Sequence, residues 1–420
     1  MRTWLLAACG LIAAGCMKTS EKYCQLHAAE DPDRCPAPDA PGGGACTGDR
    51  DCADLPTTPV CDVAGMTCVG CVTSATCAAP NPTCLPDRTC GRCKAHSDCP
   101  SQVCESDGAC AGEADVAYVT ATGTGSVCSL AMPCGTIDAA ARRDRRIIKV
   151  TGTISDNPVT LIAPVGTLDI YGAPGTKITR MSQGAIFEIR GNARIRIHDL
   201  ELTGATGSST SAHAISMAAD NPTLELHHVF LHNNVGLGIS ATTGTVVMDG
   251  CVVADNFGGG ASMQGANFAI TNSVFAQNGN TNSLTGGVTL GPSTLQRFEF
   301  NTVGDNQSSI STSGSRGVNC TGTLPIANNI YSNNRVGLNC TVTYSMFDPL
   351  TTVTGTNIEG DPMFRSTDIA AYASSTFYRI AGTSPAKNAA DPAATLATDI
   401  DGDPRPQDSR RDMGADEFRP

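Results

Sequence analysis

The sequence predicts an all-β chain: a parallel β-helix, which is a solenoid of short stacked strands, preceded by small disulfide-rich modules. Two internal repeats carry this prediction. An eleven-residue phrase recurs with starts 22 residues apart, as LELHHVFLHNN from Leu224, VVMDGCVVADN from Val246 and FAITNSVFAQN from Phe268. Upstream, a four-cysteine pattern recurs three times between Cys46 and Cys110. Self-similarity at a fixed period is typical of solenoids and repeat arrays.

The apolar spacing inside each phrase indicates strands. Apolar residues occupy the first, third, sixth and eighth places, as Leu224, Leu226, Val229 and Leu231 do in the first copy. Spacing of two, a two-residue bend and spacing of two again predict strand–bend–strand, whereas a helix needs spacing of three and four. A glycine-led third strand is expected after each phrase, at 238–239, 286–288, 317–318 and 337–338. Three strands then form one coil, and coils stack about 4.8 Å apart.

Each phrase ends on an asparagine, and these asparagines predict a buried ladder. The ladder comprises Asn234, Asn256 and Asn278, continued in weaker copies of the phrase by Asn306 and Asn334, which follow at spacings of 28 because the intervening loop is longer. Asparagine tolerates the left-handed backbone of a bend, and its side-chain amide can bond the next coil. We expect each of these residues to adopt that backbone and to bond its neighbour.

The cysteine repeat predicts three cross-linked modules of about 22 residues, because they contain few apolar residues to bury. Its members are Cys46, Cys52, Cys61 and Cys68, then Cys71, Cys77, Cys84 and Cys90, then Cys93, Cys99, Cys104 and Cys110. Pairing within a module allows three connectivities. The spacing Cys68-x2-Cys71-x18-Cys90-x2-Cys93 also fits a four-thiolate zinc site. We favour disulfides, since the repeat runs through both pairs and 21 cysteines in 420 residues indicate an oxidising compartment.

The first residues predict export. Arg2 precedes an apolar run, Trp4–Ala14, that is too short to span a bilayer, and small residues lead to Cys16. This segment resembles a bacterial lipoprotein signal with Ala13-Ala14-Gly15-Cys16 as its lipobox. The resemblance implies that Cys16 is lipidated, that an outer-membrane lipid anchors the chain, and that the protein is exported to the bacterial outer membrane or cell surface. A Cys24–Cys35 loop is expected in the following tether.

The repeat region resembles right-handed parallel β-helix proteins of the pectate-lyase-like kind. YVTATGTGSVCSLAMPCGTIDAAARR from Tyr118 is similar to that family's opening strand, Gly/Ser loop and capping helix. GTSPAKNAADPAATLATDIDGDPRPQDSRRDMGADEF from Gly382 resembles the end of bacterial surface β-helix proteins termed choice-of-anchor Q. The expected domains are 1–15 (signal peptide), 16–43 (lipidated cysteine and tether), 44–112 (cysteine modules), 113–390 (β-helix with N-terminal cap) and 391–420 (C-terminal cap).

Three cysteine assignments are expected in the β-helix. Cys320 and Cys340 both follow Gly-hydrophobic-Asn, so we place them opposite each other on successive coils and predict a disulfide. Cys128 and Cys134 bracket a short loop of the cap and form a second predicted pair. Cys251 stands at an inward place and is expected to be a buried free thiol.

One column of outward residues suggests a metal site. The fourth place of the phrase holds His198, His227 and Asp249 on successive coils, so two imidazoles and a carboxylate are predicted to stack. We consider a divalent metal there, against the alternative of a solvated polar row. No other cofactor is expected. The acidic run Asp399-x-Asp401-Gly-Asp403 lacks the twelfth-place Glu of a calcium loop, and we expect it to pair with Arg405, Arg410 and Arg411 inside the C-terminal cap.

Two function classes remain. The formal charge of −12 argues against nucleic acid as a partner. No carboxylate pair or cluster marks a lyase or hydrolase site, so no catalytic residue is assigned. We favour a non-catalytic, lipid-anchored surface protein that binds polysaccharide or a surface protein. The alternative is a surface polysaccharide lyase or glycoside hydrolase. Sugars stack on aromatic faces, and Tyr171, Phe257 and Tyr331 are the candidates for such contacts.

Overall fold

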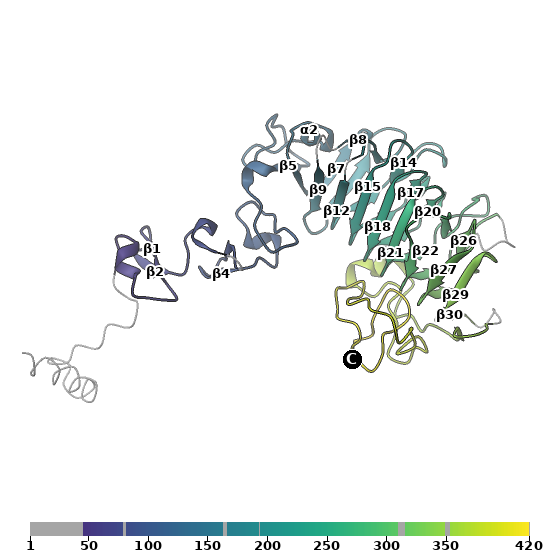
Figure 1. The fold of residues 1–420 in the computed structure, drawn as a ribbon. Helices are drawn as coiled ribbons and strands as arrows, with labels where there is room; N and C mark the ends of the chain where they lie inside the picture. Colours follow the sequence, from purple (N-terminus) through teal and green to yellow (C-terminus); the bar gives the residue numbers. More distant parts are fainter. Residues whose placement is uncertain are drawn as a thin grey trace, which may run out of the picture. The chain divides into compact units, whose positions relative to one another are not determined.

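The computed structural model describes residues 45–78, 81–162, 166–192, 194–309, 316–348 and 353–419. The chain divides into two compact units between Ala111 and Gly112 (Figure 1). The expected signal peptide, Cys16 and the Cys24–Cys35 loop lie outside the described residues. Within the described ranges, no helix is long and apolar enough to cross a membrane.

The first unit consists of three small modules with little regular structure. Its elements are the 3-10 helices η1 (Asp49–Cys52), η2 (Ser74–Thr76) and η3 (His96–Asp98), with the antiparallel pairs β1 (Val60–Asp62)–β2 (Thr67–Val69) and β3 (Thr83–Cys84)–β4 (Cys90–Gly91). Disulfides join first to third and second to fourth cysteine in every module: 46–61, 52–68, 71–84, 77–90, 93–104 and 99–110. The four cysteines of the zinc alternative therefore belong to four separate disulfides, and that alternative is wrong.

The second unit is a right-handed β-helix built from three parallel sheets. Sheet 1 contains β5 (Val116–Thr120), β6 (Ile147–Thr151), β9 (Thr167–Gly172), β12 (Arg194–His198), β15 (Thr223–His227), β18 (Thr245–Asp249), β21 (Asn267–Thr271), β24 (Gln296–Glu299), β27 (Leu324–Ala327) and β29 (Cys340–Thr343). Sheet 2 contains β7 (Thr153–Asp156), β10 (Lys177–Arg180), β13 (Glu201–Thr203), β16 (Phe230–His232), β19 (Val252–Ala254), β22 (Val274–Ala276), β25 (Thr302–Gly304), β28 (Ile330–Ser332), β30 (Met346–Phe347) and β31 (Ile358–Glu359). Sheet 3 contains β8 (Val159–Leu161), β11 (Phe187–Ile189), β14 (Ile215–Met217), β17 (Leu237–Ala241), β20 (Gly259–Met263), β23 (Val288–Leu290) and β26 (Val318–Cys320).

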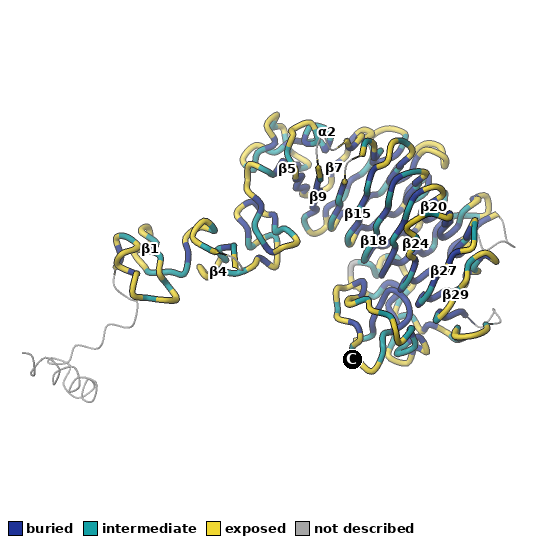
Figure 2. Tube along the Cα trace, viewed as in Figure 1, coloured by how far each residue is buried: buried dark blue, intermediate teal, exposed yellow. Residues whose placement is uncertain are grey.

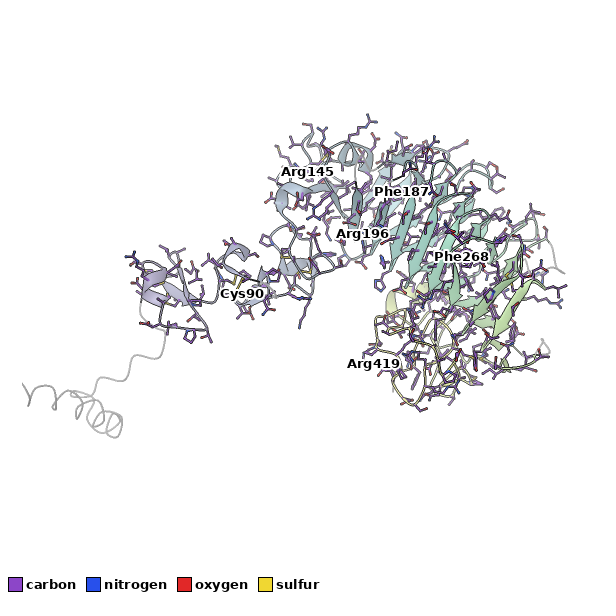
Figure 3. The ribbon with its side chains drawn as sticks, in the orientation of Figure 1. Cys90, Arg145, Phe187, Arg196, Phe268 and Arg419 are labelled. Carbon is purple, nitrogen blue, oxygen red and sulfur yellow. A yellow bond between two sulfur atoms is a disulfide. The ribbon has the colours of Figure 1, made fainter. Side chains whose placement is uncertain are left out.

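The predicted register of the repeats is confirmed. Leu224 pairs with Val246, and Val246 pairs with Phe268. The inward side chains of the three sheets form one continuous buried core, which includes Phe187 and Phe268 (Figure 3). Figure 2 colours the buried residues of the strands dark blue. The short helix α2 (Ile137–Ala141) follows the 3-10 turn η4 (Glu113–Asp115) and β5, and it buries Ile137 and Ala140 against the first coils.

The five ladder asparagines are buried and hydrogen-bonded in series. The Nδ2 atom of each of Asn234, Asn256, Asn278 and Asn306 donates to Oδ1 of the next member, over 2.7–3.0 Å. The expectation that these asparagines themselves adopt a left-handed backbone is wrong. The residue before each asparagine adopts it instead, at Asn233, Asp255, Gln277, Asp305 and Asn333. The bend requires the left-handed dihedrals at the residue before each ladder asparagine, so the side chain of the asparagine itself can point inward.

A second ladder, which the repeat does not reveal, crosses the bend between sheets 1 and 2. The backbone N–H groups of Cys251, Ser273, Asn301 and Asn329 each donate to the side chain one coil on, at Ser273, Asn301, Asn329 and Ser345. Cys251 is buried and free, as expected. The mixture of Cys, Ser and Asn at this place hides the ladder in the sequence.

The disulfide Cys320–Cys340 forms, but the two residues do not occupy equivalent places. Val318 bridges Val336, so the expected register is wrong by two residues, and Cys340 instead opens β29 opposite Leu324. Residues 337–340 make a tight turn, in which the N–H of Cys340 donates to the carbonyl of Gly337. Leu338, expected in a third strand, is fully exposed. Cys128 and Cys134 are also joined.

The C-terminal segment, residues 360–419, lies along the side of the solenoid rather than across its end (Figure 1). It contains the 3-10 helix η5 (Ile369–Ser374). Phe377, Tyr378 and Ile400 pack on outward side chains of sheet 2, such as Phe230 and Val252. This segment starts directly after β31, earlier than the expected boundary at residue 391. Sheet 2 presents apolar side chains outward, which is why it requires this lateral cover.

Candidate functional site

The column proposed for a metal ion exists, but its geometry does not suit one. His198 and His227 are in register with Asp249. The two imidazole rings are stacked, with centroids 4.9 Å apart and planes within 10°. Zn–N bonds of about 2.0–2.1 Å require two ligand nitrogens within about 4.2 Å of each other.

The remaining members of the column are engaged elsewhere. Oδ1 of Asp249 accepts hydrogen bonds from Thr271 and Asn272, over 2.8 and 2.9 Å. Burial lowers the pKa of His227. Among the described residues, the groups of His, Cys, Asp and Glu close enough to share an ion do not include this trio. The row is a stacked surface column, and the metal prediction is wrong on geometry.

The other charges on the outer face of sheet 1 pair with one another. Arg196 Nη2 lies 2.7 Å from Asp169, Arg194 Nε lies 2.8 Å from Glu225, and Arg297 Nε lies 2.6 Å from Glu299. Arg196 is marked in Figure 3. The Arg196–Asp169 pair is partly buried, since the Asp169 side chain is 3% exposed. The other two pairs are partly solvated surface contacts. Because these three carboxylates are paired with arginines, none of them is left to act across a ligand path on this face.

The three aromatic candidates differ sharply in exposure. Tyr331 is completely buried, because it takes the inward place that Leu231 holds in an earlier coil. Tyr171 is 6% exposed and stacks on His198, with centroids 4.5 Å apart. Phe257 is 56% exposed. Only Phe257 of the three presents its ring to a ligand.

Phe257 stands in a groove whose walls are two long loops. Residues 204–214 connect β13 to β14, and residues 277–287 connect β22 to β23. The two coils between them make the same connection with the short turns 233–236 and 255–258. Three coil steps of about 4.8 Å place the wall backbones about 14 Å apart.

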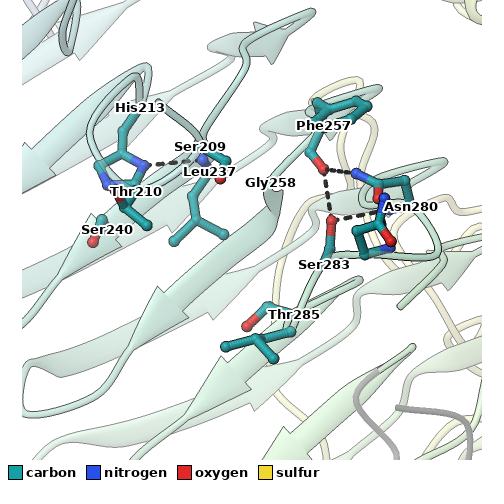
Figure 4. Close-up of a pocket in the computed structure, with 12 residues that line it drawn as sticks. Ser209, Thr210, His213, Leu237, Ser240, Phe257, Gly258, Asn280, Ser283 and Thr285 are labelled. Atoms are coloured by element: carbon teal, nitrogen blue, oxygen red, sulfur yellow. Dashed lines mark hydrogen bonds between the residues drawn. The ribbon is translucent and has the colours of Figure 1, made fainter. Parts of the chain in front are cut away.

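The floor of the groove is bare backbone beside the Phe257 ring. A Cβ on Gly258 would lie 2.7 Å from a backbone carbon of Gly236, so the two turns can stack only with glycine at residue 258. The N–H of Gly258 donates to the carbonyl of Gly236 over 3.0 Å. The 277–287 wall is pinned to this floor, since Asn280 Nδ2 and Ser283 Oγ both donate to the Phe257 carbonyl, over 2.7 and 2.8 Å (Figure 4).

Seven of the twelve residues that line the main hollow carry a hydroxyl or amide side chain, and the hollow has a volume of about 490 Å³. Its lining comprises Ser209, Thr210, His213, Leu237, Ser240, Phe257, Gly258, Asn280, Asn282, Ser283, Leu284 and Thr285. Leu284, 73% exposed, adds a second apolar contact. Hydroxyl and amide side chains around an exposed ring suit a ligand with apolar faces and polar edges.

His213 holds the 204–214 wall in place rather than offering a free base. Its Nδ1 atom accepts a hydrogen bond from the N–H of Leu237 over 2.9 Å (Figure 4). Burial lowers the pKa of the His213 imidazole, and only a hydrogen bond to the backbone of Thr210 opposes this. Because the neutral imidazole is hydrogen-bonded to the backbone on both sides, His213 has a structural role.

A second hollow of about 460 Å³ continues past the other side of Phe257. Its lining comprises Asn233, Asn234, Val235, Asp255, Asn256, Phe257 and Gly279. Because both hollows share Phe257, the ring stands in the middle of one path over the turns between sheets 2 and 3. The sequence suggested Phe257 as a residue that contacts a sugar, but it did not predict the groove. The available signal was the change in repeat spacing from 22 to 28 residues, which marks the longer wall loop.

The acidic C-terminal run is a structural cluster. Arg379 Nε and Nη2 donate to Asp401 over 2.6 and 2.7 Å, and Arg405 pairs with Glu417 over 3.1 Å. Both arginine side chains are buried. The expected partners were partly wrong. Arg410 and Arg411 donate to the backbone carbonyls of Ala389 and Leu396. The loops of this segment leave backbone carbonyls without backbone partners, and these two arginines donate to them. Closeness in the sequence to aspartates does not predict such contacts.

A match to a family model agrees with this architecture. Residues 213–368 match the family model for the right-handed beta-helix region. No match was found among curated proteins. The chain is similar to pectate lyase Pel9A, with 13% identity over 72% of this chain and 96% of that chain and a TM-score of 0.40. It is also similar to the deglycosylated pectin methylesterase from Aspergillus niger, with 15% identity, coverage of 60% and 86%, and a TM-score of 0.32.

Proposed function

We propose that this protein is exported, is anchored by a lipid on Cys16, and binds a polysaccharide in the Phe257 groove without cleaving it. The observation that carries the proposal is the groove itself. Two long loops flank two short turns, and an exposed aromatic ring stands between hollows lined by hydroxyl and amide groups. Sugar rings present C–H faces to aromatic rings and hydroxyl edges to such polar groups.

Binding without cleavage follows from the groups that line the path. A hydrolase needs two carboxylates across the scissile bond, and a lyase needs a base near the proton that is removed. The linings of the two hollows contain one carboxylate, Asp255, and one imidazole, His213, which is anchored on both sides. The groups that line the two hollows therefore suit binding of a glycan rather than its cleavage.

A retention and turnover assay tests the binding proposal. The full chain in detergent is passed over a panel of immobilised polysaccharides, which includes neutral, amino-sugar and uronic-acid polymers. Retention without new reducing ends and without absorbance from unsaturated ends is the expected result. Release of either kind of end would instead identify a hydrolase or a lyase, and failure of every polymer to retain the chain would contradict polysaccharide binding.

Anchoring is tested separately by metabolic labelling with an alkyne fatty acid. The short apolar run before Ala14-Gly15-Cys16 motivates the expectation that only the wild-type chain is labelled and that Cys16→Ser is not. Equal labelling of both chains would refute lipidation at Cys16. The eight disulfides among the described residues support export, because cytosolic proteins seldom keep them.

A further inference from the structure

The groove is almost free of charge, and its one charged side chain is negative. Among the described residues, neither hollow has a lysine or an arginine in its lining, and Asp255 is the single carboxylate. His213 is held neutral by burial and by the N–H of Leu237, as described above. The protein as a whole has a formal charge of −12. A polyuronate would therefore meet repulsion here and find no cation to pair with.

Asp255 belongs to a column in which the fold itself does not require a carboxylate. Asn233, Asp255, Gln277, Asp305 and Asn333 all adopt a left-handed backbone before the ladder asparagines. Asparagine suits that backbone as well as aspartate does and occupies both ends of the column. The conformation of the bend thus accounts for a short polar side chain at residue 255, but not for a negative one.

The neighbours of Asp255 in the column use their side chains within the protein. Asp305 accepts from Nδ2 of Asn333 over 2.7 Å, Gln277 donates to the carbonyl of Thr367, and Asn233 contacts the ring of His232 over 2.8 Å. Within the described ranges, the Asp255 carboxylate makes no hydrogen bond or ion pair, although it is exposed and lines the second hollow. The nearby His232 is committed to Glu201 and Asn233.

The surroundings of Asp255 favour an incoming cation. Burial by the neighbouring turns raises the pKa of this carboxyl, and the only opposing contribution comes from His232. A partly desolvated carboxylate without a partner is stabilised when a positive group arrives beside it. Phe257 lies two residues further along the same turn, and both residues line the second hollow, so one sugar chain in that hollow can meet both side chains.

We propose that the groove selects a glycan that carries protonated amino groups, a polymer of hexosamine with free amines, and that Asp255 is the counter-charge for one amine. This inference rests on the proposed polysaccharide binding and specifies its class. The sugar ring covers Phe257, its hydroxyl groups reach the serine, threonine and asparagine side chains of the main hollow, and an ammonium group faces Asp255.

Calorimetric titration of the full chain in detergent, at about pH 6.5, tests the assignment. The probes are a β-1,4-linked glucosamine hexamer, its fully N-acetylated counterpart and a galacturonate hexamer. We expect the glucosamine hexamer to bind most tightly and the galacturonate hexamer least. Asp255→Asn should weaken glucosamine binding about threefold to fivefold, the effect of one exposed ion pair, and leave the N-acetylated hexamer unaffected. Added salt should weaken wild-type binding more than binding by the variant.

Asp199→Asn is the matched control, because Asp199 is also an exposed aspartate with a left-handed backbone but belongs to the bend between sheets 1 and 2. It should bind all three probes as the wild type does. Equal binding of the glucosamine and N-acetylated hexamers, or an unchanged glucosamine affinity in Asp255→Asn, would overturn the amino-group assignment and leave polysaccharide binding intact. Failure of all three hexamers to bind would also overturn it, and the broader polysaccharide panel then judges the proposed function on its own.

Discussion

Asn256 uses its side chain fully inside the solenoid. Its Nδ2 atom donates to the Leu231 carbonyl and to Asn278, and its Oδ1 atom accepts from the backbone and the side chain of Asn234. The residue is completely buried. Removing such a side chain leaves donors and acceptors on both neighbouring coils without partners, which costs more than one hydrogen bond contributes.

At the residue scale, we therefore expect Asn256→Leu to lower the free energy of unfolding by about 1–3 kcal/mol. Chemical denaturation monitored by far-UV circular dichroism measures this change. Asn282→Leu is the control, because Asn282 is exposed in the 277–287 loop and stands outside the ladder. Equal denaturation midpoints for the two variants would show that the ladder contributes no net stability.

Repetition decides which single residues can be predicted from sequence. The ladder could be predicted because asparagine recurs at one place in five coils. The second ladder could not, because serine fills its place at Ser273 and Ser345 but asparagine fills it at Asn301. Exposure of aromatic residues follows the inward and outward places of the phrase. That rule explains the buried Tyr331, whereas Phe257 lies in a turn where no period applies.

At the element scale, the last coils depart most from the repeat. Sheet 3 ends at β26, while sheets 1 and 2 continue to β29 and β31. The chain from Val336 to Cys340 turns back early and is tied to β26 by the disulfide. The similarity of the two Gly-hydrophobic-Asn-Cys segments predicts a third strand at residues 337–338, but the chain forms a tight turn at residues 337–340 instead.

The Cys320–Cys340 disulfide should stabilise this incomplete coil. It closes a segment with a sequence separation of 20 residues, for which loss of unfolded-state entropy corresponds to roughly 3 kcal/mol. We expect the double variant Cys320→Ser/Cys340→Ser to lose a measurable part of that free energy of unfolding. Non-reducing peptide mapping of the wild type should find these two cysteines in one species. Finding either one joined to a cysteine of the N-terminal modules would refute the arrangement.

The C-terminal segment should make stability depend on pH. Burial raises the pKa of Asp412 to about 6 and of Asp416 to about 7, from the ordinary value of 3.8. The folded chain therefore binds protons more tightly than the unfolded chain between about pH 4 and pH 7. Stability from these groups is complete below that window and is lost as the pH rises through it. One pKa unit corresponds to about 1.4 kcal/mol.

Thermal unfolding at pH 5 and pH 8 tests this expectation. The melting temperature of the wild type should fall between the two pH values, and Asp416→Asn should reduce the fall, because its side chain is neutral at both. Arg379 keeps Asp401 as its partner in the variant. An identical fall in wild type and variant would exclude Asp416 as a source of the pH dependence.

At the scale of the whole molecule, repeat length and loop length have separate roles. The 22-residue coils give an even stack with short turns, and the longer coils on either side carry the loops that wall the groove. Sequence alone predicted the stack, since its period is explicit. It could not predict the groove, because the fold of a long loop depends on local contacts such as those from Asn280 and Ser283 to the Phe257 carbonyl.

The central claim is that a polysaccharide binds across the exposed ring of Phe257. Its most direct test is titration of the full chain with whichever polymer retains it, compared with Phe257→Ala. Loss of the ring removes about 1.4 kcal/mol of apolar contact, so affinity should fall about tenfold. Leu338→Ala, which removes a fully exposed apolar side chain from a turn outside the groove, should bind as the wild type does. An unchanged affinity in Phe257→Ala, with the variant folded as the wild type is, would contradict the account.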